Sequence, residues 1–377
     1  MSASGSVAAP DAADDLRFMT LALALGRRGL GRAWPNPAVG AVIVKNGEIV
    51  GRGWTQPGGR PHGEIEALRR AGAMARGATL YVTLEPCSHH GKSPPCADAV
   101  IAGGIARVVS AMEDPNPEVA GRGHARLRGA GIVVDVGLEA ATARRDHAGH
   151  IRRMRDGRPQ VMLKLAISAD GKVAGQGGRP VAITREAVRN RVHLMRAHSD
   201  ALMTGIGTVL ADDPVLTCRL PGMIKVSPAR VVLDSKLRLP PQSRLFATAR
   251  DTPLWIVTGE HTPAAAEGAA RAHGAEVVRT VEKNGRLDLH AVLKLLATRG
   301  ITRLMVEPGP TLASALVEAD LIDEAVFFHS PMVIGEGGVA AFEPRVVQAF
   351  EQRLKRVSSE PVGSDRQETF ERGSDHV

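Results

Sequence analysis

The chain has 377 residues, of which 44% are hydrophobic and 3% aromatic, and its formal net charge is +8. This length suits two domains of ordinary size or one large domain, and the apolar content is enough for a packed core. The low count of three cysteines argues against a disulfide framework, and the scarcity of aromatic residues argues against a protein that stacks single-stranded nucleic acid.

The N-terminal segment 1–14 is small, polar and partly acidic, and we expect a disordered tail there. It shows no export signal, and the apolar run at 16–25 is too short to cross a bilayer. The sequence therefore predicts a cytoplasmic protein without a membrane partner. The positive charge suits phosphorylated small molecules or nucleic acid, although a generally arginine-rich surface would explain it equally well.

The first half of the chain alternates helix-like and strand-like segments. Helical spacing over 15–29 precedes two strand-like runs within 38–54, joined by Asn46-Gly47, a pair typical of a type I′ hairpin. The next expected elements are a helix over 62–77, a strand over 78–85, a helix over 96–104, a strand over 106–112, a helix over 123–131 and a strand over 132–137. This order predicts a three-layer α/β domain with a mixed sheet.

Three side chains in this half could bind a metal ion. His62 begins one predicted helix, Cys87 follows a strand, and Cys96 begins the next helix. Imidazole and thiolate are preferred zinc ligands, and three of them leave a fourth position for water. Glu64 could then carry a proton from that water to a leaving amine. Inert thiols or a structural zinc pair are the alternatives, but the combined pattern favours a catalytic centre.

Four stretches closely resemble the deaminase half of a bifunctional riboflavin-biosynthesis family, the diaminohydroxyphosphoribosylaminopyrimidine deaminase joined to a 5-amino-6-(5-phosphoribosylamino)uracil reductase. They are PNPAVGAVIVKNGEIVGRG, PHGE, TLEPCSHHGKSPPCADAVI and DPNPEVAGRG. The long loop between the two cysteines separates this family from cytidine, tRNA-adenosine and guanine deaminases. The resemblance implies a cytidine-deaminase-like domain over 15–150.

The same resemblance implies roles for individual residues. One zinc ion would be held by His62, Cys87 and Cys96, with Glu64 as the catalytic proton carrier. Contacts to the substrate are implied for Asn36, His89 and Lys92, although Lys92 could also be a solvated loop charge. The chain departs from the family pattern at Gly63, where alanine is usual and a glycine could loosen the helix start. It also departs at Thr55, where many members have a histidine on the substrate side.

A basic, polar stretch over 144–160 marks the predicted domain boundary, with a linker over 151–158. A strand follows over 161–174, in which apolar residues alternate with a face that carries Lys164, Ser168 and Asp170. A lysine on a buried strand is costly without a role or a partner, and the alternative is an edge strand with one solvated face.

The remaining pattern predicts a second α/β domain. Strand–turn–helix units are expected over 199–214 and 301–324, strands over 229–240, 252–259 and 275–280, and a helix over 289–300. The glycine-containing turns of the two units could direct backbone N–H groups at phosphate oxygens. The complete dinucleotide fingerprint of a Rossmann fold is missing, so we do not assign that fold.

Four further stretches look like the reductase half of the same family: KLAISADGKVA, TGIGTVLADDPVLTCR, VVLDS and VEPGPTLASALV. The resemblance implies a dihydrofolate-reductase-like α/β domain, placed at 159–360, that uses NADPH to reduce a ribosyl group to ribityl. Lys164 would act as a catalytic group near the sugar. Implied substrate contacts are Pro180, Arg196, Leu216, Arg219 and Glu307. Implied NADPH contacts are Ala166, Ala182, Thr208, Asp212, Ser235, Gly309, Pro310, Thr311 and Leu312.

The second half also departs from the family pattern. The segment 180–182 lacks the serine and tryptophan that many members have there, which removes a hydrogen bond and a stacking surface for the cofactor. Pro308 replaces the usual glycine or alanine. The stretch after residue 345 matches no interpretable pattern, and we expect 361–377 to be a disordered tail. Cys218 is expected to fill the core rather than to bind metal.

The leading hypothesis is a bifunctional enzyme of riboflavin biosynthesis. It would deaminate 2,5-diamino-6-(5-phosphoribosylamino)pyrimidin-4-one with zinc and then reduce the ribosyl chain with NADPH, as a homo-oligomer (a dimer or a tetramer) that binds no nucleic acid. One alternative is a nucleic-acid or nucleoside deaminase with a non-catalytic C-terminal domain. Another is a structural-zinc binding protein whose reductase half has decayed.

Overall fold

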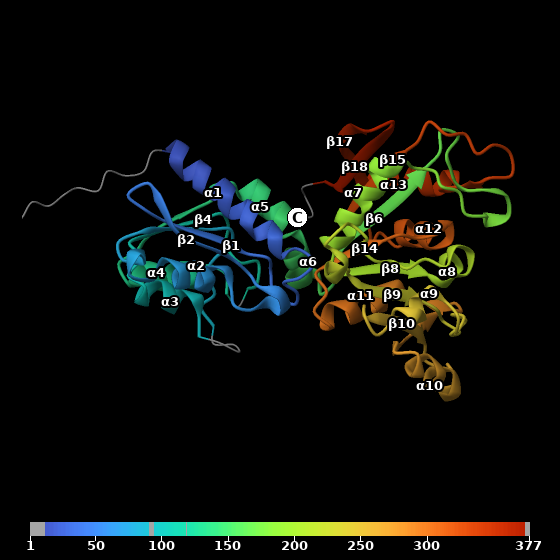
Figure 1. The fold of residues 1–377 in the computed structure, drawn as a ribbon, viewed down its shortest axis with the longest axis horizontal. Coiled ribbons are helices and arrows are strands. Elements are labelled where there is room, and N and C mark those ends of the chain that lie inside the picture. The colour runs from blue at the N-terminus through green and yellow to red at the C-terminus, as the bar shows by residue number, and fades with distance from the viewer. Residues whose placement is uncertain (1–11, 90–93, 118, 374–377) are drawn as a thin grey trace, which may run out of the picture. The chain divides into compact units, whose positions relative to one another are not determined.

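The computed structural model describes residues 12–89, 94–117 and 119–373, which divide into two compact units between Arg155 and Asp156 (Figure 1). None of the helices in these ranges combines the length and the apolar character that crossing a membrane requires.

The N-terminal unit is built on a five-stranded sheet with the order β2-β1-β3-β4-β5. β1 is antiparallel to β2 and β3, whereas β3, β4 and β5 are parallel, so the predicted mixed sheet is confirmed. The strands are β1 (Gly40–Lys45), β2 (Glu48–Trp54), β3 (Thr79–Val82), β4 (Arg107–Ser110) and β5 (Val133–Val136). Positive φ angles at Asn46 (52°) and Gly47 (80°) confirm the predicted hairpin turn.

Helices cover both faces of this sheet, which confirms the three-layer prediction (Figure 1). α1 and α5 lie together on one face, and α2, α3 and α4 lie on the other. Their bounds are α1 (Ala12–Gly26), α2 (Gly63–Ala71), α3 (Cys96–Ala102), α4 (Arg122–Gly129), α5 (Ala140–Asp146) and α6 (Ala148–Asp156). The first helix therefore begins inside the segment 1–14 that was expected to be disordered, because Ala12 to Asp14 already belong to α1.

The C-terminal unit contains a nine-stranded sheet with the order β11-β10-β9-β8-β14-β6-β15-β18-β17. Neighbouring strands from β11 to β15 are parallel, and β18 and β17 complete the sheet in antiparallel pairing. Its strands are β6 (Gln160–Ile167), β8 (Ala201–Gly205), β9 (Ala229–Leu233), β10 (Leu254–Gly259), β11 (Glu276–Thr280), β14 (Arg303–Val306), β15 (Glu324–His329), β17 (Leu354–Val362) and β18 (Asp365–Arg372).

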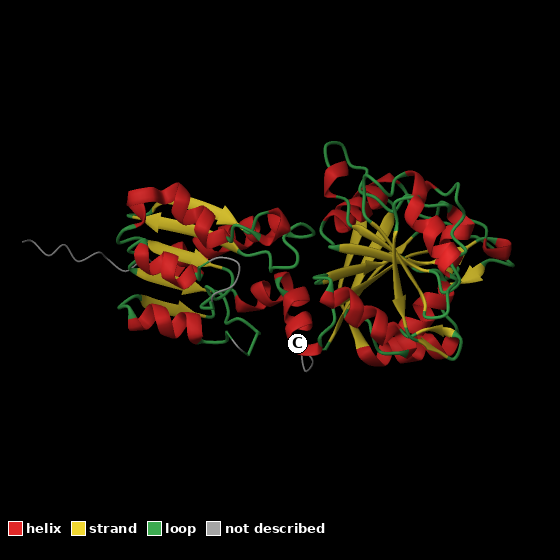
Figure 2. Ribbon diagram, turned by 90° about the horizontal axis from the view of Figure 1, so that it is seen from below, coloured by secondary structure: helices red, strands yellow, loops and turns green. Residues whose placement is uncertain are grey.

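Helices flank this twisted sheet on both sides (Figure 2). They are α7 (Glu186–Ala197), α8 (Ile206–Asp212), α9 (Arg244–Ala247), α10 (Ala264–Ala272), α11 (Leu289–Thr298), α12 (Pro310–Glu318) and α13 (Pro344–Arg353). Two small strand pairs lie outside the main sheet: β7 (Lys172–Ala174) with β16 (Val339–Ala340), and β12 (Glu282–Lys283) with β13 (Arg286–Leu287).

The predicted strand over 161–174 is divided into β6 and β7. β6 lies between β14 and β15, so the edge-strand alternative is wrong. Val161, Leu163 and Leu165 are buried, whereas Lys164 and Ala166 on the opposite face are partly exposed, as the alternation predicted. A lysine on an interior strand needs partners, and these are described below.

Two predicted boundaries are wrong. The linker expected over 151–158 is largely helical, because α6 continues to Asp156 and buries Ile151. The tail expected to be disordered over 361–377 contains all of β18, which pairs with β15 and β17 on its two sides. Polar side chains hid this strand from pattern analysis, since backbone pairing and the packing of Phe370 against Phe327 stabilise it rather than an apolar face. Cys218 is fully buried in this unit, as predicted.

Candidate active sites

The three predicted metal ligands converge in the N-terminal unit. His62 is the N-cap of α2, Cys87 lies in the loop after β3, and Cys96 is the first residue of α3. Their ligand atoms all lie within 4.8 Å of one another. His62 Nδ1 is 3.2 Å from Cys96 Sγ and 3.8 Å from Cys87 Sγ. One imidazole nitrogen and two sulfur atoms therefore face a common point, which is the donor set that zinc prefers.

The electrostatics of this cluster favour a thiolate. A hydrogen bond from Cys96 lowers the pKa of the Cys87 thiol to about 4, with help from His62 and against the effect of burial. The backbone N–H of Cys96 also points at Cys87 Sγ across 3.3 Å. Because the thiolate is the form that binds metals, Cys87 is prepared for coordination.

Glu64 lies beside the cluster on the first turn of α2. Its side chain is buried, with 3% of the residue exposed, and Oε2 has no hydrogen-bond partner among the described residues. Burial raises the pKa of this carboxyl above its ordinary value. The charge of His62 lowers the pKa and that of Cys87 raises it, but the effect of burial is the largest. A buried carboxyl oxygen without a partner is costly, so its retention here points to a ligand or a reacting group.

The other residues that were predicted for this site differ in their burial and in their distance from the metal cluster. Asn36 Nδ2 is 3.1 Å from His62 Nε2 and donates a hydrogen bond to the carbonyl of Gly59 at 2.8 Å. His89 is exposed two residues after Cys87. Lys92 lies outside the described residues. Thr55 is buried, and its hydroxyl accepts a hydrogen bond from the backbone N–H of Val39 at 3.0 Å. It thus makes a structural contact at the position where a histidine was expected in many members of the family.

Gly63 has a steric role that the sequence did not reveal. A Cβ atom at this position would lie 2.7 Å from the carbonyl oxygen of Val39 and 3.2 Å from the Cα of Trp54. The glycine therefore lets the start of α2 approach β2 and the segment before β1 closely. This start carries both His62 and Glu64, so close packing fixes the position of two of the four site residues.

Glu85 is a further residue that sequence analysis missed. Its carboxylate accepts hydrogen bonds from the backbone N–H groups of Asp114 (3.1 Å), Gly121 (2.9 Å), Gly123 (2.7 Å) and His124 (3.1 Å). It thereby fastens the segment 114–124 next to the loop that carries Cys87. The available signal in the sequence was a glutamate two residues before a predicted metal ligand, in the stretch TLEPC.

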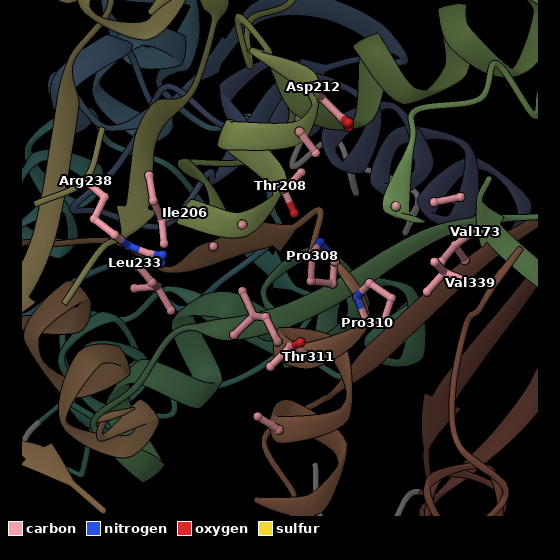
Figure 3. Close-up of a pocket in the computed structure, with 18 of the residues that line it drawn as sticks. Val173, Ile206, Thr208, Asp212, Leu233, Arg238, Pro308, Pro310, Thr311 and Val339 are labelled. Carbon is pink, nitrogen blue, oxygen red and sulfur yellow. The ribbon is translucent and has the colours of Figure 1, made fainter. Parts of the chain in front are cut away.

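The C-terminal unit has a cavity of about 620 Å³ at the carboxyl ends of β8, β9 and β14 (Figure 3). This edge of a parallel sheet is where ligands commonly bind in α/β proteins. Several predicted cofactor residues line it, namely Thr208, Asp212, Ser235, Gly309, Pro310, Thr311 and Leu312. Pro180, predicted as a substrate contact, and its neighbour Val181 line it as well, whereas Ala166 and Ala182 do not.

Lys164 has the partner that its position on β6 requires. Its Nζ lies 4.0 Å from Glu307 Oε2, and Arg196 donates two hydrogen bonds to the same carboxylate, at 2.6 and 2.9 Å. Burial opposes ionisation of Glu307, but the charges of Arg196 and Lys164 prevail and lower its pKa to about 2. Burial lowers the pKa of Lys164. The trio forms a mostly buried group in which two basic side chains face one carboxylate.

The two other predicted substrate residues, Leu216 and Arg219, do not line the cavity, but Arg196 of the trio donates a hydrogen bond to the carbonyl of Thr217, which lies between them in the chain, at 3.1 Å. Leu216 is buried with a φ of 57°. The backbone N–H of Arg219 donates to His193 Nδ1 at 3.4 Å. Burial and the charge of Arg196 both lower the pKa of the Arg219 guanidinium, which indicates that the two arginines share one region. Such a pair suits a dianionic group.

Part of the cavity wall was not predicted from the sequence. Val173, Ala174 and Val339 from the β7–β16 pair line one part of it, and Arg238, Arg286, Leu287 and Leu289 line another. Arg286 follows a second Asn-Gly turn, in which Asn284 (φ 54°) and Gly285 (φ 70°) repeat the pattern of the first hairpin. That pair was a usable hairpin signal, although it could not show that the hairpin borders a cavity.

Comparisons with known families divide the chain as the fold does. Residues 12–112 match the family described as the cytidine and deoxycytidylate deaminase zinc-binding region, and residues 159–367 match the RibD C-terminal domain. Among the curated relatives, the riboflavin biosynthesis protein RibD of Escherichia coli (strain K12) is 45% identical over 335 residues, covering 85% of this chain and 89% of that protein. RibD of Aquifex aeolicus is 38% identical and covers 93% of this chain and 96% of that protein.

Solved structures agree with these matches. Acinetobacter baumannii RibD, form 1, superposes with a TM-score of 0.85 at 35% identity, covering 97% of this chain and all of that one (100%). The diaminohydroxyphosphoribosylaminopyrimidine deaminase/5-amino-6-(5-phosphoribosylamino)uracil reductase from Thermotoga maritima superposes with a TM-score of 0.83 at 34% identity, covering 96% and 99%. These matches span both units and do not favour a nucleic-acid deaminase with a non-catalytic second domain. The chain therefore belongs to the RibD family of riboflavin biosynthesis proteins, with a deaminase domain followed by a reductase domain, and is both a hydrolase and an oxidoreductase.

Proposed function

We propose that the N-terminal unit deaminates 2,5-diamino-6-(5-phosphoribosylamino)pyrimidin-4-one with one zinc ion held by His62, Cys87 and Cys96. The observation that carries this proposal is the approach of one imidazole nitrogen and two sulfur atoms to within 4.8 Å of one another, beside a buried carboxyl oxygen of Glu64 that lacks a partner. The donor types fit zinc, and three protein ligands are the number typical of a catalytic site. A bound zinc ion supplies Lewis-acid activation of a water molecule.

Glu64 carries the protons of this reaction. Its Oε2 takes a proton from the attacking water as the new C–O bond forms at the amine-bearing ring carbon. The same oxygen then delivers a proton to the departing nitrogen, so that the C–N bond breaks and ammonia leaves. Burial of Glu64 helps because it brings the pKa of the carboxyl closer to neutral pH. Asn36, 3.1 Å from the His62 ring, would orient the pyrimidine through its amide.

For the C-terminal unit, we propose NADPH-dependent reduction of the ribosyl group of the deaminated product. The cavity at the carboxyl ends of β8, β9 and β14 has the size for a dinucleotide, and its mostly apolar lining with a few polar side chains is typical of cofactor sites. Gly309, the N-cap of α12, and the helix start at Pro310 would face the diphosphate. Bound NADPH supplies the hydride that reaches C1′ of the sugar.

The buried trio acts on the sugar in this proposal. Lys164 Nζ would donate a proton to the ring oxygen as the C1′–O bond opens, and Glu307 holds both Lys164 and Arg196 in position. Arg196 and Arg219 would bind the phosphate. The balance is one hydride added at C1′ and one proton added at oxygen, which gives the open-chain ribityl product.

Mass spectrometry of the reaction with the diaminopyrimidine substrate tests both halves. We expect ammonia release without NADPH, and a gain of two hydrogens only when NADPH is added. Dialysis against a zinc chelator should abolish the first step and spare NADPH binding, and added zinc should restore deamination. Deamination by protein that contains no zinc would contradict the first half, and a deaminated product that gains no hydrogen from NADPH would contradict the second.

A further inference from the structure

The basic stretch over 144–160, which was expected to contain a linker, forms the last helix of the N-terminal unit. This helix, α6, buries Ile151 in the apolar core of the unit. Two of its polar side chains, His150 and Arg153, form hydrogen bonds to two loops of the same unit. The two residues are three positions apart in a helix and therefore lie on one face of it.

Arg153 reaches the loop that carries Asn36. Its Nη1 donates a hydrogen bond to the carbonyl oxygen of Pro35 at 2.8 Å. This oxygen belongs to the same peptide group as the backbone N–H of Asn36, which donates to the carbonyl of Ala33 at 3.1 Å. Because a peptide group is planar, holding both its oxygen and its N–H fixes the direction in which the chain enters Asn36. Pro35 is exposed, so hydrogen bonds rather than burial hold this peptide group.

The side chain of Asn36 lies between a glycine and a proposed metal ligand. Its Nδ2 donates to the carbonyl of Gly59 at 2.8 Å and lies 3.1 Å from Nε2 of His62. A Cβ atom at Gly59 would lie 3.0 Å from the Cβ of Asn36, so the two residues are closely packed. A small change in the backbone at Asn36 would therefore move its amide relative to a pyrimidine that is bound at the metal.

His150 anchors α6 at the second loop. Its Nε2 donates a hydrogen bond to Oδ1 of Asp114 at 3.2 Å, and the two side chains are only 10% and 11% exposed. The backbone N–H of Asp114 in turn donates to the carboxylate of Glu85, two residues before Cys87. Because Arg153 lies on the next turn of the same helix face, this anchor limits how far its guanidinium can move relative to the loops of the site.

Resting on the proposed deamination by this unit, we propose that Arg153 is a positioning residue of the deaminase. It holds the peptide group between Pro35 and Asn36 so that the amide of Asn36 meets the pyrimidine beside the metal ligands. In this role Arg153 acts through Asn36 and transfers no proton. The helix α6 thereby belongs to the deaminase site.

A double-mutant cycle on the full-length protein tests this proposal, with ammonia release from the diaminopyrimidine substrate as the measurement. We expect R153A to lower kcat/KM by about 5- to 30-fold, the contribution of one partly exposed hydrogen bond from a charged donor, and N36A to lower it at least as much. Once residue 36 is alanine, R153A should change kcat/KM by less than about twofold. A residue that only stabilised the unit would lower kcat/KM by the same factor in both backgrounds.

Substrate binding provides a measurement that does not depend on turnover. In E64Q, where deamination should be slow, calorimetry should show that R153A weakens substrate binding by a factor similar to its effect on kcat/KM. The zinc content of R153A should equal that of wild type, because its three proposed metal ligands are unchanged.

Two further variants serve as controls. Arg155 is an exposed cation on the same helix, but it is two residues further on and so lies on another face, and R155A should deaminate as wild type does. R153K can still donate one hydrogen bond to the carbonyl of Pro35 and should retain part of the lost rate.

Three results would overturn the proposal. They are a wild-type kcat/KM in R153A, a full loss from R153A in the N36A background, and a wild-type rate in N36A, which would leave Arg153 no site residue to position. If the wild-type protein released no ammonia from the substrate, the proposed deamination itself would be contradicted, which is a different result from additivity in the cycle.

Discussion

The two sites of this protein are assembled in different ways. The four central residues of the deaminase site lie between His62 and Cys96, at two helix starts and in one loop, and they are mostly buried. The reductase cavity is lined by residues from Val173 to Val339, taken from strand ends, helix starts and two small strand pairs. A site that depends on a few donor atoms in fixed positions can come from a short stretch of sequence. The residues that line a cavity for a large ligand, by contrast, are spread along the chain.

The largest expected effect is on Glu64, and it tests whether the two sites are independent. E64Q keeps the shape of the side chain but removes the proton acceptor, so the deamination rate should fall by about 10²- to 10⁴-fold. The zinc content should not change, because Glu64 is not among the three proposed ligands, and NADPH binding should not change, because Glu64 belongs to the other unit. Ammonia release, metal analysis and cofactor fluorescence measure these three quantities on one preparation.

Glu66 provides a matched control for this variant. It lies on the same helix and is also buried, but its carboxylate pairs with Arg69 at 2.9 Å. E66Q should therefore retain deamination close to the wild-type rate. An E64Q protein that deaminates as fast as E66Q would show that another group carries the proton.

The next prediction is that the trio of Lys164, Arg196 and Glu307 contributes to the free energy of unfolding of the reductase unit. E307Q leaves Lys164 and Arg196 close together without a carboxylate, and loss of one member of a buried ion pair costs about 3–5 kcal/mol. Glu307 has its pKa lowered from 4.5 to about 2 in the folded state. The stabilisation linked to its ionisation, about 3 kcal/mol, is therefore fully present above pH 4.5 and is lost as the pH falls toward 2.

Urea unfolding of both proteins at a series of pH values measures this effect. The gap between wild type and E307Q should be widest near neutral pH and should narrow as the pH falls from 4.5 toward 2. The control is E318Q, because Glu318 is 49% exposed and its pair with Arg345 lies at the surface, so the change should cost less than about 1 kcal/mol. A pH-independent gap for E307Q would mean that the carboxylate is not held ionised by its neighbours.

Sequence analysis was most informative where chemistry and periodicity act locally. The hairpin at Asn46-Gly47, the alternation along β6 and the convergence of His62 with Cys96 all follow from short patterns, and the structure has each of them. The features that sequence analysis did not predict depend on contacts between residues far apart in the chain. β18 has little apolar alternation and is stabilised by strands on both sides, and Glu85 meets backbone groups that lie about thirty to forty residues later.

Gly63 gives opposite predictions from sequence and from structure. Helix propensity alone predicts that G63A would stabilise the unit by up to about 1 kcal/mol. The structure predicts the reverse, since the added Cβ would lie 2.7 Å from the backbone oxygen of Val39, and relieving that contact should cost about 1–3 kcal/mol. G129A is the control, because a Cβ at Gly129, on α4, meets open space and should not destabilise. Thermal unfolding decides the sign, and a stabilised G63A protein would show that the start of α2 can move away from Val39.

The smallest expected effect concerns the segment 180–182, which forms part of the wall of the cavity in the C-terminal unit. The family resemblance places a stacking tryptophan at Ala182, but in this structure Pro180 and Val181 line the cavity and Ala182 is exposed outside it. If the segment can present residue 182 to bound NADPH, A182W should tighten NADPH binding by about two- to tenfold, the contribution of one aromatic contact. V181W is the contrasting variant, because a tryptophan there would occupy cavity space and weaken binding. Dissociation constants from fluorescence titration separate these results, and an A182W protein with unchanged affinity would mean that this chain encloses its cofactor through residues 180 and 181 instead.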